Sequence, residues 1–166
     1  LLVVGDSKNI EFSGLRGFIK NILSHFNYYR YADKVKHIAQ NNEHIFFIPP
    51  TYQVKSLIEQ SFCVVSFFTV PHANLPLAES IWLGKPSVAA DTPEAREYTV
   101  DGKASLLFKI NDIDDFRKKI LFALENEKLI NSNAVAGQNI IQEKFDPIRN
   151  SELLNNIYKD LLAKDN

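Results

Sequence analysis

The 166-residue sequence contains no methionine, a single cysteine and no apolar run long enough to cross a membrane. A membrane-spanning helix needs about 20 consecutive apolar residues, and no signal-peptide pattern is visible either. With one cysteine, Cys63, the chain cannot form an internal disulfide. We therefore expect a buried structural thiol in a reducing compartment, and a cytoplasmic protein.

The sequence also lacks an excess of charge of either sign. Nineteen Lys and Arg residues balance twenty Asp and Glu residues, so the formal net charge is −1. This balance excludes bulk electrostatic attraction to nucleic acid or to an anionic membrane. Apolar residues make up 45% and charged residues 23% of the chain, as is typical of a globular domain with a full core.

Several common ligand motifs are missing. There is no G-x-G-x-x-G dinucleotide fingerprint and no Walker phosphate loop. His25, His37 and His44 have no metal-ligand spacing, so neither a metal nor a cofactor is expected. His72 differs because it falls in a loop that follows an apolar run.

Short apolar runs, rich in β-branched and aromatic residues, alternate with longer helical patterns. The runs cover residues 1–5, 44–48, 62–68, 86–90 and 105–108. The helical patterns between them cover residues 14–42 (one or two helices), 52–60, 75–83 and 94–100. The runs show no in/out alternation, as expected for strands covered on both faces. The pattern predicts an α/β fold, with a three-layer Rossmann-like parallel sheet and helices on both faces.

After Phe108 the pattern becomes helical. Asp112 is the expected N-cap of a helix whose apolar face carries Ile113, Phe116, Ile120 and Leu124. Two more helices follow, and Asp146 with Pro147 marks the start of the last one. We expect a Rossmann-like domain over residues 1–145 and a C-terminal helix over 146–166 packing on it. Because the chain opens directly on an apolar strand, we also expect it to be part of a longer protein.

The loops after the strands are the candidate ligand sites, because open parallel sheets bind ligands at the carboxyl ends of their strands. Gly5 and Asp6 follow the first strand, either as a tight turn or as a ligand contact. Another such loop reads "TVPHANLP", residues 69–76, and it leads into the helix that carries Glu79.

The start of that helix has the features of an anion site. Asn74 is a candidate N-cap and Pro76 fits the first turn, while free N–H groups and the helix dipole favour a phosphate. Glu79 lies about one turn further on, where a carboxylate can accept hydrogen bonds from two ribose hydroxyls. Alternatively, Glu79 merely complements the helix dipole. In the next loop, Arg96 and Glu97 are either ligand contacts or a surface ion pair.

The run from Pro71 to Phe108 resembles the donor-binding core of group 1 glycosyltransferases (retaining family 4), which have the GT-B fold of two facing Rossmann-like halves. Their pattern reads E-G-F-G-L-P-x-x-E-A-x-x-x-G-x-P-V-x-x-S/D, then a loop ending in glutamate, then V-x-D-G-x-x-x-L-F. The residues in register are Leu75, Pro76, Glu79, Gly84, Pro86, Val88, Asp91, Glu97, Val100, Asp101, Gly102, Leu107 and Phe108. The resemblance extends over residues 45–162. The combination of motifs is specific to the family, although no single motif is.

The resemblance implies the donor-binding half of an enzyme that moves a sugar from a UDP-, GDP- or ADP-type donor to an acceptor hydroxyl, with retention. Glu79 would hold the ribose, the tip at Asn74 to Leu77 would face the diphosphate or sugar, and Pro49 to Thr51 would lie near the base. The implied donor-binding residues are Glu79, Asn74, Leu75, Pro76, Leu77, His72, Glu97, Gly5, Pro50 and Thr51. No residue of the chain is assigned as catalytic.

Three departures from the family pattern stand out. Pro71 takes the place of a first glutamate eight residues before Glu79, a residue that normally touches the donor sugar. Asn74 replaces a glycine, and Pro93 with Glu94 replaces a pair of glycines. The first β-α unit of the family, which carries Arg and Lys for the diphosphate, is expected upstream of Leu1.

The resemblance places the parent enzyme in polysaccharide, lipopolysaccharide or glycolipid assembly. A sugar or lipid-linked acceptor and any peripheral membrane contact would belong to the other half, so this chain alone is expected to be inactive. Two alternatives stay open: a non-catalytic nucleotide-sugar-binding or interaction domain of the same fold, and a flavodoxin-like regulatory domain.

Overall fold

The computed structural model describes residues 2–4, 35, 37–70 and 73–164. They form two compact units, Leu1–Val54 and Lys55–Asn166, and each is described by itself. The helices predicted over residues 14–42 lie outside the described residues, apart from the helical positions 35 and 37–40.

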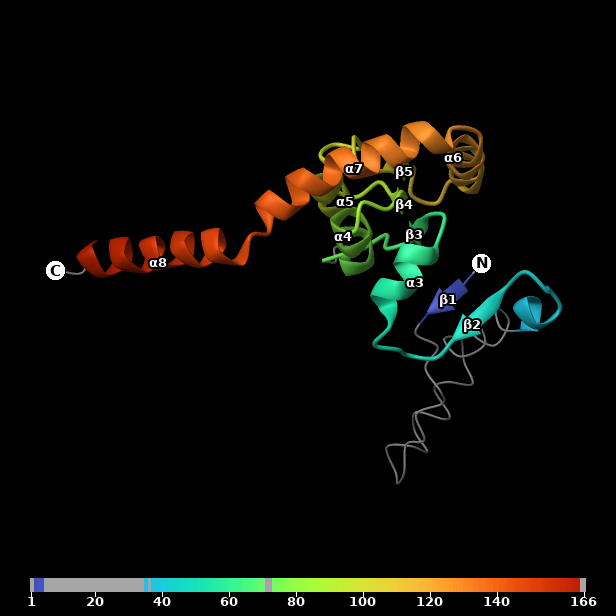
Figure 1. The fold of residues 1–166 in the computed structure, drawn as a ribbon, viewed down its shortest axis with the longest axis horizontal. Coiled ribbons are helices and arrows are strands. Elements are labelled where there is room, and N and C mark those ends of the chain that lie inside the picture. The colour runs from blue at the N-terminus through green and yellow to red at the C-terminus, as the bar shows by residue number, and fades with distance from the viewer. Residues whose placement is uncertain (1, 5–34, 36, 71–72, 165–166) are drawn as a thin grey trace, which may run out of the picture. The chain divides into compact units, whose positions relative to one another are not determined.

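The first unit contains a two-stranded parallel sheet (Figure 1). Strand β1 (Leu2–Val4) pairs with β2 (Phe46–Ile48), with Leu2 opposite Phe46 and Val4 opposite Ile48. Both strands lie where the apolar runs predict them, and the parallel pairing is confirmed.

The second unit contains a three-stranded parallel sheet with the order β3-β4-β5. Its strands are β3 (Val64–Ser66), β4 (Ser87–Ala90) and β5 (Leu106–Phe108). Helix α3 (Val54–Gln60) precedes β3, α4 (Leu75–Trp82) joins β3 to β4, and α5 (Pro93–Thr99) joins β4 to β5. The prediction of a parallel α/β architecture with helical connections is therefore confirmed.

Strand β4 is central, and its four residues are all buried. Because side chains alternate along a strand, Ala89 faces one side and contacts a cluster that includes Leu77, Ile81 and Ile141. Val88 and Ala90 face the other side and pack with Phe108. In Figure 1, α4 and α5 lie on one side of the strands and α6 on the other, which gives the predicted three layers.

Helix α6 (Ile113–Glu125) begins at the predicted N-cap, where the Asp112 side chain accepts a hydrogen bond from the Asp115 N–H. Its predicted apolar face is only half right. Phe116 and Ile120 pack on the sheet, whereas Ile113 and Leu124 are exposed. The buried face of α6 continues instead through Ala123. Because alanine is small, a pattern of large apolar residues does not mark it.

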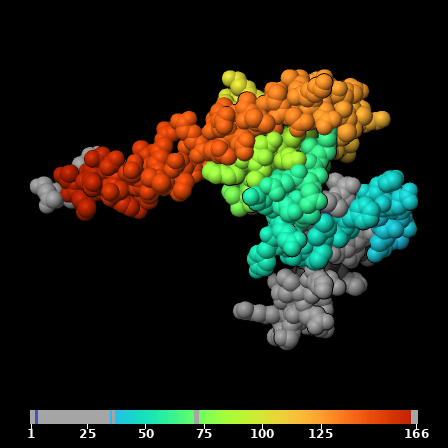
Figure 2. All heavy atoms as spheres, in the orientation of Figure 1, coloured from blue at the N-terminus to red at the C-terminus, as the bar shows by residue number. Residues whose placement is uncertain are grey.

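Helix α7 (Glu127–Lys144) packs along α4, and the space-filling view shows the orange α7 atoms directly against the green α4 region (Figure 2). Helix α7 also lies close to Ala104, in the segment that leads into β5. Gly137 makes this approach possible, because a Cβ at this position would overlap the Ala104 side chain. A buried glycine in the middle of a helix is thus explained by the approach of the segment that leads into β5.

Helix α8 (Pro147–Lys164) begins as predicted, with the Asp146 carboxylate accepting hydrogen bonds from the N–H groups of Ile148 and Arg149. Every residue from Pro147 to Ala163 is exposed. The boundary between the two compact units falls after Val54. The packing of the last helix on a domain that ends at residue 145 stays a prediction.

Candidate functional site

The candidate site lies where the carboxyl end of β3 meets the start of α4. Leu77, Ser80 and Ile81 form the buried face of α4, and α7 packs close to Ile81. Glu79 lies on the opposite face and its side chain is exposed. The arrangement leaves this carboxylate accessible to a ligand.

Glu79 is the fifth residue of α4, and the first turn contains no acidic residue. The interaction of a charge with the helix dipole falls off within the first turn. Interaction with the helix dipole is therefore a weak reason for a glutamate at position 79. The alternative that Glu79 merely complements the dipole loses much of its support.

Asn74 occupies the N-cap position, as predicted, but its side chain does not cap the helix. Its backbone is left-handed, with φ 40° and ψ 49°. The Ser66 hydroxyl donates a 2.7 Å hydrogen bond to Asn74 Oδ1, and both side chains are buried. The amide of Asn74 is therefore turned toward the sheet and away from the helix N-terminus.

The first turn of α4 uses most of its own N–H groups. The N–H groups of Leu77 and Ala78 both donate to the Asn74 carbonyl, at 3.1 and 3.2 Å, and Pro76 has no N–H. The N–H of Leu75, the first residue of the helix, has no such partner within α4. Leu75 and Pro76 are exposed, whereas the Leu77 side chain is fully buried in the core.

Arg96 and Glu97, in helix α5, form different ion pairs from the expected one. Arg96 Nε and Nη2 each donate to the Asp91 carboxylate at 2.6 Å, and this hydrogen bonding raises the pKa of Arg96. Glu97 instead accepts a 2.8 Å salt bridge from Lys144 Nζ, at the end of α7. A pair between Arg96 and Glu97 is thus wrong, because Arg96 pairs with Asp91 and Glu97 pairs with Lys144.

The remaining predicted binding residues are Pro50, Thr51, Gly5 and His72. Pro50 is exposed, and the Thr51 hydroxyl oxygen accepts a 3.1 Å hydrogen bond from the Gln53 N–H. Both belong to the first unit. Gly5 and His72, together with Pro71 and Asp6, lie outside the described residues.

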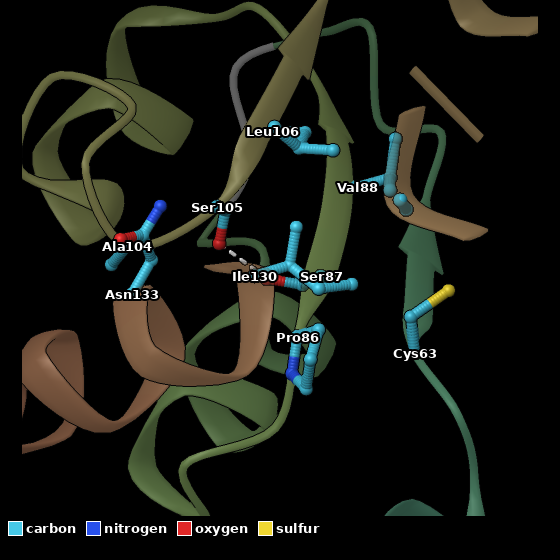
Figure 3. Close-up of a pocket in the computed structure, with 10 residues that line it drawn as sticks. Cys63, Pro86, Ser87, Val88, Ala104, Ser105, Leu106, Ile130 and Asn133 are labelled. Carbon is cyan, nitrogen blue, oxygen red and sulfur yellow. Dashed lines mark hydrogen bonds between the residues drawn. The ribbon is translucent and has the colours of Figure 1, made fainter. Parts of the chain in front are cut away.

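A small cavity lies at the other end of the sheet, where β4 and β5 begin (Figure 3). Its volume is about 10 Å³, room for at most one water molecule. Ser87 and Ser105 hydrogen-bond to each other beside it, and Cys63 lines it. Burial raises the pKa of the Cys63 thiol, which disfavours the reactive thiolate. These properties fit the predicted structural role of Cys63.

Two residues of the site region carry structural roles that the sequence analysis did not assign. Ser66 anchors Asn74, and no local motif marks a serine at the end of an apolar strand for this purpose. Thr92 is the N-cap of α5, and its hydroxyl accepts a hydrogen bond from the Ala95 N–H. The Thr-Pro pair at 92–93 is a recognisable helix start.

Parallel strands joined by crossover helices define an open-sheet α/β protein. The family model for glycosyl transferases group 1 matches residues 27–142 of the chain. The chain belongs to this glycosyltransferase family. The flavodoxin-like alternative is therefore wrong.

Solved structures agree on the fold. HepE of Anabaena in complex with UDP-glucose is 18% identical, with a TM-score of 0.71 and 95% of this chain covered. HepE with UDP and glucose is also 18% identical, with a TM-score of 0.70. Sucrose-phosphate synthase of Thermosynechococcus elongatus is 15% identical, with a TM-score of 0.70 and 98% coverage. The fold is thus that of one half of a GT-B glycosyltransferase.

The chain spans only part of these proteins: 40% and 39% of HepE and 38% of the synthase. No curated protein sequence matches it. Among the described helices, none is both long and apolar enough to cross a membrane.

Proposed function

We propose that the chain is the donor-binding half of a retaining glycosyltransferase, which transfers a sugar from a nucleoside-diphosphate sugar to an acceptor hydroxyl. The observation that carries the proposal is the exposed Glu79, on a helix that begins at the carboxyl end of β3. Family membership supports the reaction class. The acceptor is expected to bind to the other half of the protein.

The donor is oriented by two features of α4. The positive end of the helix dipole and the Leu75 N–H attract the diphosphate. Glu79, one turn further along, accepts hydrogen bonds from the ribose hydroxyls. Pro50 and Thr51 are assigned to the base, and Gly5 and His72 to the edge of the site.

Leu77 and Glu97 also make contacts that stabilise the helices around this site. The buried Leu77 holds α4 on the core, and the salt bridge between Glu97 and Lys144 holds α5 to the end of α7. Both residues stay proposed donor-binding residues.

The chemistry is expected to rest on positioning and on stabilisation of the anionic leaving group. As the bond from the sugar to the diphosphate breaks, negative charge grows on the phosphate oxygens beside the helix N-terminus. Glu79 is a binding residue and neither an acid nor a base. We propose that no metal ion is required and that cations of the full protein complete the neutralisation.

A uridine diphosphate donor is the first candidate, because HepE, of the same fold, is solved with UDP-glucose. GDP- and ADP-sugars are the alternatives. Assembly of a polysaccharide, lipopolysaccharide or glycolipid is the proposed context, in the cytoplasm.

Substitution of Glu79 tests the proposal. Removing the carboxylate in Glu79→Ala or Glu79→Gln deletes charge-assisted hydrogen bonds worth about 1.5–3 kcal/mol. We expect the affinity of the full-length protein for its nucleoside diphosphate to fall about 10- to 100-fold, as measured by titration calorimetry with UDP, GDP and ADP.

The matched control is Glu125→Gln, which alters an exposed glutamate at the end of α6 and should leave the affinity unchanged. Unaltered affinity in both Glu79 variants would show that the donor lies elsewhere.

A second candidate is a nucleotide-sugar-binding domain without catalysis. The proline at position 71, where the family pattern has a glutamate, favours it. This candidate predicts donor binding that depends on Glu79 but no sugar transfer by the full-length protein, whereas the first predicts both.

A further inference from the structure

Asn74 is the residue just before α4, and it accepts two sets of hydrogen bonds. Its side chain accepts from Ser66, the last residue of β3, and its carbonyl accepts from the N–H groups of Leu77 and Ala78 in the first helical turn. One residue thus connects the end of the strand to the start of the helix.

Both side chains of the connection are almost fully buried, with exposed fractions of 4% for Ser66 and 1% for Asn74. A buried hydrogen bond is costly to break, because the partner that remains loses its hydration without compensation. The residues that follow Ser66, from Phe67 to Val70, are exposed. The bond therefore fixes the helix start directly to the sheet.

The residue type fits this place for two independent reasons. With φ 40° the backbone lies in the left-handed region, where asparagine is tolerated and most other side chains are strained. The neutral amide also accepts the hydrogen bond from the Ser66 hydroxyl without adding a negative charge. An aspartate would make the same bond but would repel an anionic ligand at the helix N-terminus.

We propose that Asn74 is a positioning residue, which acts through its buried bond to Ser66 to hold the first turn of α4, and with it Leu75 and Glu79, in the geometry that binds the donor. Asn74 touches the sheet and not the donor. The inference rests on the proposed function, since it explains how the same site is kept in place.

The test uses the full-length protein with three variants: Asn74→Gly, Ser66→Ala and the double variant. Glycine adopts the left-handed backbone without strain and removes the Asn74 side chain. Ser80→Ala is the control, because it deletes another buried hydroxyl of α4, one that donates to the Leu77 carbonyl at 2.7 Å. All of these variants are expected to lower the melting temperature.

Two measurements separate positioning from stability. The first is amide hydrogen exchange of the peptide that contains Leu77 and Ala78, in the absence of ligand. The second is the dissociation constant for UDP, or for GDP or ADP where UDP does not bind. We expect faster exchange and about five- to tenfold weaker binding in Asn74→Gly and in Ser66→Ala. The double variant should be no weaker than the single ones, because all three remove the same bond.

Ser80→Ala should leave both the exchange of this peptide and the affinity unchanged. Equal effects of Ser80→Ala and Asn74→Gly on affinity, or additive effects of the two single variants, would overturn the inference while the proposed function stands. If no nucleoside diphosphate binds the unaltered protein, the proposed function fails. The exchange measurement then decides by itself whether Asn74 and Ser66 hold the helix start.

Discussion

Single residues set the ends of α4, and Gly84 shows how. Gly84 has φ +64°, its N–H donates to the Ile81 carbonyl, and the N–H of Lys85 donates to the Ser80 carbonyl. These two bonds form a Schellman motif, which satisfies the last carbonyls of the helix. The helix ends just before Gly84, as the helical pattern over residues 75–83 predicts, because glycine favours the left-handed conformation more than any other residue.

Substitution at Gly84 is expected to destabilise the second unit. In Gly84→Ala the left-handed backbone costs about 1–2 kcal/mol, and the new Cβ lies 3.0 Å from the Gln138 side-chain oxygen. Urea unfolding should show a loss of about 1–2 kcal/mol. Gly84→Asn places the same Cβ on a residue that tolerates φ > 0, so its loss should be smaller; equal losses would contradict the backbone argument.

At the residue scale, the sequence predicts where a residue lies in the secondary structure better than it predicts which residue its side chain contacts. Asn74 lies at the expected N-cap, yet its side chain bonds to Ser66, eight residues earlier. Arg96 and Glu97 lie in the short helix that follows β4, yet they pair with Asp91 and Lys144. A local pattern carries no information on contacts made by a distant segment, such as the one between α5 and the end of α7.

At the scale of elements, the sequence predicted the strands and helices closely where apolar residues are buried. All five predicted strands are found in the described part of the chain, because runs of β-branched and aromatic residues mark buried parallel strands. The buried face of α6 was predicted in part, since Ala123 contributes to packing but little to apolar periodicity. The close contact of α7 with the segment before β5 was not predicted, because it depends on a missing side chain at Gly137.

The contact at Gly137 makes a prediction for α7. Alanine favours a helix over glycine by about 1 kcal/mol, but overpacking a close contact costs about 1–3 kcal/mol. Since the added Cβ would overlap Ala104, we expect Gly137→Ala to lower the free energy of unfolding.

The matched control is Asn139→Ala, at an exposed position of the same helix. It should be neutral or slightly stabilising by differential scanning calorimetry. A stabilised Gly137→Ala variant would show that α7 and Ala104 separate easily.

At the scale of the whole molecule, the α/β architecture follows from the order of the elements. Alternating strands and helices specify a parallel sheet with helices on both faces, and β4, with its two clusters, shows this directly. The division between the two units was not predicted. It falls after Val54, the first residue of α3, and no change in composition marks it in the sequence.

The exposed α8 predicts that the 166-residue chain keeps its stability without this helix. Its described links to the preceding helix are an exposed ion pair between Arg149 and Glu143 and a hydrogen bond from Asn150 to the Lys144 carbonyl. Exposed pairs contribute about 0–1 kcal/mol. Removal of residues 147–166 should therefore change the free energy of unfolding by about 1 kcal/mol or less, as measured by chemical denaturation; a loss of several kcal/mol would contradict it.

The same helix has a consequence for how the chain behaves in concentrated solution. Its exposed apolar residues recur at helical spacing: Leu153, Leu154, Ile157, Tyr158, Leu161 and Leu162. A stripe of this kind adds nothing to the stability of the monomer but lowers its colloidal stability, since neighbouring molecules stick through such surfaces. The length of chain chosen for expression will therefore decide solubility and monodispersity more than it decides folding.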